Sequence, residues 1–274
     1  LGLPGSGFSV CGSHCRCKLV PENYKGENLD KPLVKEKKKP LSVTDPKMAG
    51  KHKTVTDATK WAEKNGVIHH QLDKMPLDYV NEINVAISKM PNQYQRDLVV
   101  GDFNYFMKVT GQKMTGMELA NYGVSLSMDM MNSKLFTLKE KIALSKKGVG
   151  GSYNFVALNS KGYKNLDEML KYQKRTGLKY LERTGNKWSL DYFKGSTVYH
   201  EFGHIVHNQL PTAMRKEWDV IAKKWVDVAF VDMIKKKASW TEEYAEAFAE
   251  AWATYKKGNK SILPDYIIKF MDNI

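Results

Sequence analysis

Cysteine is scarce in this chain of 274 residues: there are only three, and none occurs after Cys17. A disulfide-stapled scaffold is therefore excluded for the main body, and folding in a reducing cytoplasm is favoured. The sequence also lacks any run of about 18 to 20 consecutive apolar residues, which a membrane-spanning helix requires. It shows no basic and then apolar signal sequence either. We therefore expect neither a membrane protein nor a visibly secreted one.

Acidic residues are also few, since 30 Asp and Glu stand against 43 Lys and Arg, a net charge of +13. Nearly half of this excess lies in Lys31–Lys53, where eight lysines face two acidic residues. The segment contains three prolines and few large apolar side chains, so burial cannot offset the entropy of ordering it. We interpret residues 23–53 as a basic flexible linker. A tether for nucleic acid through Lys31–Lys53 is the alternative.

The cysteines and His14 are too crowded to favour one tetrahedral zinc ion within this segment. The run Gly12–Leu19, however, resembles the His...Cys-Arg-Cys ending of the phage Mu F-type head-morphogenesis (minor capsid) domain. The resemblance covers this short segment alone and implies that residues 1–22 are the tail end of such a domain. Because the chain begins with Leu1, we expect a longer parent polypeptide. The resemblance also implies phage head components as partners, in the virion or the bacterial host cytoplasm.

Regular spacing of apolar residues begins at about Thr54 and continues to the end of the chain. We predict helices over residues 57–65, 77–87, 92–107, 197–209, 212–236, 241–256 and 264–272. Alternating or continuous apolar residues predict strands over 124–130 and 153–158, the second after a glycine-rich turn. The predicted class for residues 54–274 is therefore α+β, mostly helical with a small mixed sheet.

The segment Val198–His204 contains the motif His-Glu-x-x-His. On an α-helix His200 and His204 project from one face, so that both imidazoles can bind a single Zn²⁺. Glu201 lies beside that face, where it can take a proton from a metal-activated water molecule and pass it to a leaving amine. Three of the chain's seven histidines lie within eight positions here, which argues against coincidence.

Catalytic zinc usually takes three protein ligands and leaves the fourth position free. The extended motif that supplies a third histidine needs Gly at position 207 and His at position 210, but the chain has His207 and Leu210. That family is excluded by the two mismatches. His207 points to a different part of the helical face from His200, and we expect it to be a supporting or surface residue.

A carboxylate from a later helix is the remaining source of a third ligand. Glu242, Glu246 and Glu250 repeat every four residues between Trp240 and Trp252, beside alanine and aromatic residues. Small alanines allow such a helix to lie close against the motif helix. An acidic face in contact with solvent is the alternative interpretation.

The two segments together are similar to the gluzincin pattern of the anthrax lethal factor family. There, H-E-F-G-H is followed later by a helix of the type A-E-F-F-A-E-A-F, which matches His200–His204 and Ala245–Ala251. The resemblance is strong over 196–207 and 240–255. It implies a zincin-like metallopeptidase fold and one catalytic Zn²⁺. It also implies that His200, His204 and Glu246 are the zinc ligands, that Glu201 is the general base and that Glu250 is a supporting carboxylate.

This chain lacks one residue of that family at its usual position. Its members have an oxyanion-stabilising tyrosine seven residues before the ligand glutamate, where this chain has Ser239. Tyr244, Tyr199 and Tyr192 are the alternatives, and spacing does not select among them.

Zincins also commonly hold substrate along the edge of a small sheet. The strand after the glycine-rich turn is the candidate for this edge, and an ordinary core strand is as good an interpretation. The residues concerned are Tyr153, Asn154, Phe155, Val156 and Ala157.

These observations predict a zinc-dependent endopeptidase whose substrate is a protein or peptide. One alternative is a virion protein that zinc stabilises without catalysis. The other is a nucleic-acid-binding capsid component that uses the lysine surplus, although the chain lacks the interleaved aromatic residues that base stacking needs.

Overall fold

The structure is a computed structural model. It describes residues 45–95, 97–111, 113, 123–129, 134–137, 139, 141, 152–159, 166–228, 231, 232, 234 and 244–274. All of them belong to one structural unit, Pro40–Ile274. The predicted capsid-domain tail and most of the predicted linker lie outside the described residues. Within the last part of the predicted linker, Ala49 is buried in the core of this unit.

Four strands form a mixed sheet in the order β1-β2-β4-β3. The strands are β1 (Val67–His70), β2 (Leu98–Asp102), β3 (Gly123–Asp129) and β4 (Ser152–Leu158). β1, β2 and β4 run parallel, whereas β3 is antiparallel to β4 and is the last of the described strands on that side. The α+β prediction with a small mixed sheet is confirmed at this level.

The prediction that Tyr153–Ala157 forms a substrate-binding edge is wrong. β4 pairs with β2 on one side and with β3 on the other, so its backbone hydrogen-bonding groups are engaged on both sides. The physical reason lies in its side chains: residues 153–158 are all buried, which is typical of a central strand covered on both faces. Among the described strands, the edge on this side of the sheet is β3.

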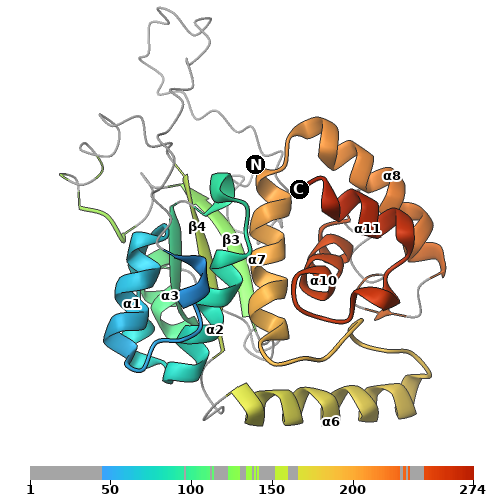
Figure 1. Cartoon of the computed structure of the whole chain (residues 1–274), viewed down its shortest axis with the longest axis horizontal. Coiled ribbons are helices and arrows are strands. Elements are labelled where there is room, and N and C mark those ends of the chain that lie inside the picture. The colour runs from blue at the N-terminus through green and yellow to red at the C-terminus, as the bar shows by residue number, and fades with distance from the viewer. Residues whose placement is uncertain are drawn as a thin grey trace, which may run out of the picture. The chain divides into compact units, whose positions relative to one another are not determined.

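Helices pack beside this sheet, and the C-terminal helices gather together on one side of it (Figure 1). Their bounds are α1 (Val55–Lys64), α2 (Leu77–Ser88), α3 (Phe103–Thr110), α6 (Leu166–Thr184), α7 (Ser196–Gln209), α8 (Thr212–Val228), α10 (Ala245–Lys256) and α11 (Asp265–Asp272). Short 3₁₀ turns add η1 (Pro46–Met48), η2 (Leu72–Lys74), η3 (Asn92–Tyr94) and η4 (Lys260–Ile262). No helix among the described residues is long and apolar enough to span a bilayer.

The predicted helix over 92–107 is wrong, because this stretch forms η3, β2 and α3. A short apolar run such as Leu98–Val100 fits a buried strand and a buried helix equally well, so periodicity did not separate them. α6 was not predicted. Its buried seam is narrow and includes Gln173 and Gly177 beside two apolar residues, which leaves little apolar periodicity to recognise.

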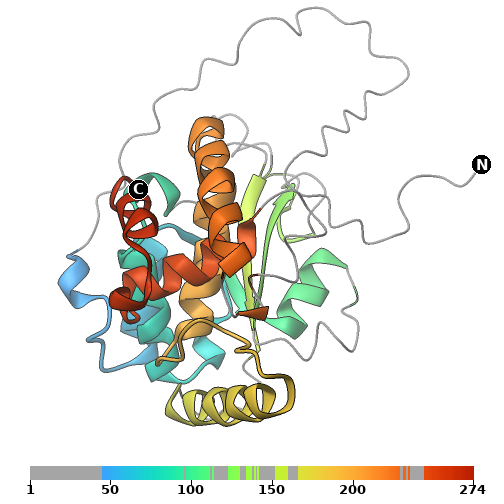
Figure 2. The ribbon, with the colours of Figure 1, turned by 90° about the vertical axis from the view of Figure 1, so that its right-hand side faces the viewer.

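α7 lies between the sheet and the helices α8, α10 and α11 (Figure 1). It contacts β3 and β4 on one side and packs most extensively against α10 on the other. α6 runs along one end of the unit, as the view turned by 90° also shows (Figure 2). The helix that carries the His-Glu-x-x-His motif is therefore the central element of the described fold.

Candidate metal centre

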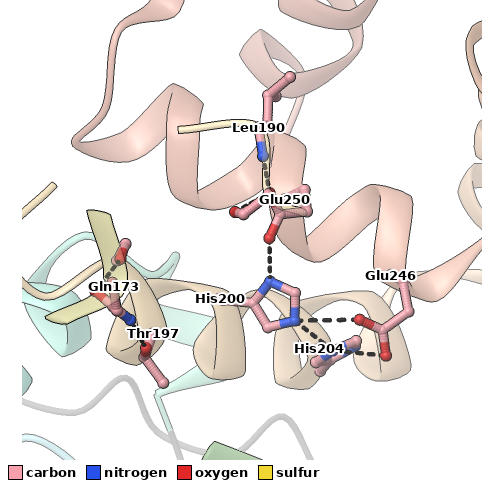
Figure 3. Close-up of polar contacts among 9 residues, drawn as sticks. Gln173, Leu190, Thr197, His200, His204, Glu246 and Glu250 are labelled. Atoms are coloured by element: carbon pink, nitrogen blue, oxygen red, sulfur yellow. Dashed lines mark hydrogen bonds and ion pairs between the residues drawn. The ribbon is translucent and has the colours of Figure 1, made fainter. Parts of the chain in front are cut away.

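The motif helix α7 begins after Gly195, whose φ of +83° favours glycine. A Cβ at this position would lie 2.4 Å from Cγ of Glu82, which gives a second reason for glycine. Ser196 and Thr197 are the first two residues of the helix. Gln173 of α6 binds both: its Nε2 donates to Thr197 Oγ1 at 2.6 Å, and its Oε1 accepts from Ser196 Oγ at 3.2 Å (Figure 3).

A close crossing brings α7 and α10 together. A Cβ on Gly203 would lie 2.8 Å from Cα of Ala249 and 3.2 Å from Cβ of Trp252. These distances leave no space for a side chain, so the glycine of the motif and the alanine of α10 permit the approach. The expectation that small residues let the glutamate helix lie close to the motif helix is met at this crossing.

Substituting Gly203 by alanine is expected to push the two helices apart. The new methyl group would meet backbone, which cannot swing aside, so we expect the free energy of unfolding to fall by about 1 to 3 kcal/mol. Chemical denaturation measures this change. Asn208→Ala is the matched control, because it adds alanine to the exposed side of the same helix. An unfolding free energy for Gly203→Ala equal to the control's contradicts the close crossing.

Three side chains converge where the helices cross. Nε2 of His200 lies 3.1 Å from Nε2 of His204 and 3.2 Å from Oε2 of Glu246. Oε1 of Glu246 lies 3.5 Å from Nε2 of His204 (Figure 3). Ligand atoms about 2.0 to 2.1 Å from a tetrahedral Zn²⁺ are about 3.3 Å apart, so the observed spacings fit one zinc ion. Among the described residues, this is the group of histidine and carboxylate side chains arranged to hold a metal.

The electrostatics of this group favour a cation. Burial raises the pKa of Glu246, but His204 and His200 outweigh burial and hold that pKa well below its usual range. Burial lowers the pKa of His200, but Glu246 and Glu250 outweigh it and raise that pKa well above its usual range. The two carboxylates thus favour positive charge at this place, and two imidazoles with a carboxylate are a donor set that suits a divalent metal.

Glu250 contacts Nδ1 of His200, the ring nitrogen that does not face Glu246 (Figure 3). Its Oε1 lies 2.9 Å from Nδ1 of His200. A carboxylate only accepts hydrogen bonds, so Nδ1 carries a proton, and Nε2 is the ring nitrogen that faces His204 and Glu246. The supporting position predicted for Glu250 agrees with this contact.

Glu201 lies on the same helix but contacts the sheet. It is buried, and a Cβ on Gly123 of β3 would be 2.7 Å from its Cγ and 2.8 Å from its Oε1. The carboxylate therefore lies against the backbone at the start of the edge strand. An isolated glycine in a strand can indicate such a close approach, but Gly123 was not singled out because the predicted strand began at residue 124.

Two of the three candidate oxyanion donors lie elsewhere. Tyr199 is fully buried, with Nζ of Lys89 and of Lys257 5.6 and 5.4 Å from its ring centroid, and burial and Glu82 raise its pKa. The hydroxyl of Tyr192 lies against Gly177 of α6. These contacts remove both from the metal cluster.

Tyr244 is the N-cap of α10, directly before Glu246 and Ala245. Its carbonyl accepts a hydrogen bond from Trp218 Nε1 at 2.9 Å, which fixes its backbone. Ser239 and Glu242 lie outside the described residues.

His207 is a core residue and not a surface one. It is 1% exposed, and its ring centroid lies 5.1 Å from that of Phe248. Burial, followed by the nearby charges of His204 and Arg215, lowers its pKa to about 3, so the imidazole is neutral. Its exclusion from the predicted ligand set agrees with this position.

The residues that sequence reasoning missed come from segments without a motif. Ser189 and Leu190 bind Glu250, and Gln173 binds the start of α7. These contacts join residues far apart in the chain, so no local sequence pattern predicts them.

Comparison of the chain with protein-family models, with curated proteins and with solved structures gives no match.

Proposed function

We propose that this chain is a zinc-dependent endopeptidase of gluzincin type with a zincin-like fold. The observation that supports this most strongly is the convergence of His200, His204 and Glu246 at the spacing of three zinc ligands. Glu201 on the same helix adds a carboxylate next to a strand edge. Three ligands, and not four, are typical of a catalytic zinc site.

The proposed chemistry assigns each side chain a role. His200, His204 and Glu246 hold the metal, and Glu250 fixes the orientation of His200. A bound Zn²⁺ supplies Lewis-acid polarisation of a carbonyl and lowers the pKa of water. Glu201 accepts a proton from the attacking water and delivers it to the leaving nitrogen as the peptide bond breaks.

The edge strand β3 is the part of the fold that favours a polypeptide as the substrate. Among the described strands β3 pairs only with β4, so an extended peptide can add to its other side as a further strand. The start of β3 lies against Glu201, which would bring a bound peptide backbone next to the general base. This proposal replaces β4 by β3 as the substrate edge.

Tyr244 is the tyrosine we retain as the oxyanion donor. It directly precedes the helix that carries Glu246, whereas the contacts of Tyr199 and Tyr192 turn them to other parts of the fold. An oxyanion donor can contribute about 3 to 4 kcal/mol to catalysis. A role beside phage head components, in the virion or the host cytoplasm, is supported by the N-terminal resemblance alone.

Metal removal tests the proposed activity. We expect the purified chain to cleave an unstructured protein such as casein, to lose this activity in excess chelator, and to regain it when Zn²⁺ is restored. Gel electrophoresis of the digests gives the readout. Zinc bound without any cleavage would instead favour the non-catalytic, zinc-stabilised alternative.

A further inference from the structure

The orientation of Glu250 is set by a segment of the chain that no motif marks. Its Oε2 accepts a hydrogen bond from Oγ of Ser189 and another from the backbone N of Leu190, both at 2.7 Å. Its Oε1 accepts the bond from His200. Both oxygens of this buried carboxylate are therefore used, one toward the metal cluster and one toward the segment between α6 and α7.

This segment is itself fixed on both sides. The ring of Trp188 packs edge-on against Tyr180 of α6, with centroids 5.2 Å apart. Asp191 accepts a hydrogen bond from the backbone N of Asn259 at 3.0 Å, beyond the end of α10. Ser189 thus lies between two anchored neighbours and presents its hydroxyl to Glu250 from a defined position.

We propose that Ser189 is a positioning residue of the metal centre. Its hydroxyl fixes the rotation of the Glu250 carboxylate, and that carboxylate in turn holds the Nδ1–H of His200, so that Nε2 faces the metal. Carboxylates that orient metal-bound histidines need donors of their own when they are buried. The inference rests on the proposed zinc site and adds to it a residue outside both motif segments.

The expected effect of Ser189→Ala is a measurable but incomplete loss of zinc affinity. The Leu190 backbone donor remains, so the carboxylate stays bound at one of two points. Loss of a residue outside the ligand set typically costs about 10- to 100-fold in metal affinity, and with one donor left we expect about 3- to 10-fold. Ser189→Thr retains a hydroxyl and should restore most of the affinity.

The experiment measures zinc dissociation constants of the full chain by competition with a chromophoric chelator. Ser88→Ala is the matched control, because Ser88 is also partly buried and its hydroxyl donates to the Val85 carbonyl within α2. The d–d absorption spectrum of the Co²⁺-loaded protein is recorded alongside, since a changed histidine orientation alters it. We expect Ser189→Ala to weaken zinc binding and shift the spectrum, and Ser88→Ala to do neither.

A double-mutant cycle shows whether Ser189 acts through Glu250. In a Glu250→Ala background, Ser189→Ala should cause no further loss of affinity, because its acceptor is gone. An equal loss in both backgrounds, or an unchanged affinity with only a lower unfolding temperature, would overturn the proposal and leave Ser189 a structural residue. If the wild-type chain binds no zinc, the proposed function itself fails, which is a separate and recognisable result.

Discussion

Replacing Glu246 by alanine is expected to remove zinc from the purified protein. Structural zinc sites with four ligands bind with about 10 to 16 kcal/mol, or roughly 3 kcal/mol for each ligand. Loss of one of three ligands should therefore weaken binding by about a hundredfold or more. The expected loss is direct, because the two oxygens of Glu246 face the two imidazoles at 3.2 and 3.5 Å.

Elemental analysis of wild type and variant, purified in parallel and dialysed against metal-free buffer, measures this loss. Glu217→Ala is the matched control, since it removes an exposed carboxylate from α8. We expect the control to keep its zinc. Full zinc content in Glu246→Ala would show that this carboxylate is not a ligand.

Replacing Glu201 by glutamine is expected to abolish peptide hydrolysis and to leave zinc in place. Glutamine has the same shape and fills the same space against Gly123, but its amide cannot accept the proton of the attacking water. General acid–base catalysis typically contributes about 10² to 10⁴ in rate, and a loss of this size is expected here. Glu201 is not one of the three side chains whose ligand atoms gather to hold a metal.

Rates of casein cleavage, measured at equal zinc content, test this prediction. The zinc content and unfolding temperature of Glu201→Gln serve as its own controls, because both should match the wild type. An active Glu201→Gln would assign the proton transfer to another group. Loss of zinc together with activity would mean that Glu201 also supports the metal.

The motif and its helix were predictable because their signals are local. The four-residue spacing of His200 and His204, and of Glu246 and Glu250, follows from helical periodicity alone. The resemblance to the lethal factor family then paired the two helices, and the structure brings their side chains together. What the sequence alone did not reveal was that Gly203 lies at the crossing that makes this approach physically feasible.

The sheet was less predictable because strand order depends on contacts between distant segments. The run Phe155–Leu158 carried a usable signal, since consecutive apolar residues are typical of a central strand, yet the glycine-rich turn before it favoured an edge. In β3, Ser125 and Ser127 alternate with apolar residues, a pattern that predicts a strand but does not tell an edge strand from a central one. Ser189 and Gln173 carry no local signal, because a hydroxyl or an amide acquires its role only from its partner in the folded chain.

The central claim is that this chain holds zinc at the crossing of α7 and α10. The most direct test is the zinc content of the wild-type protein, measured by elemental analysis after dialysis against metal-free buffer. The geometry of His200, His204 and Glu246 predicts about one zinc ion per chain. A content near zero in protein that is folded and was supplied with zinc contradicts the account and reduces the His-Glu-x-x-His motif to a coincidence.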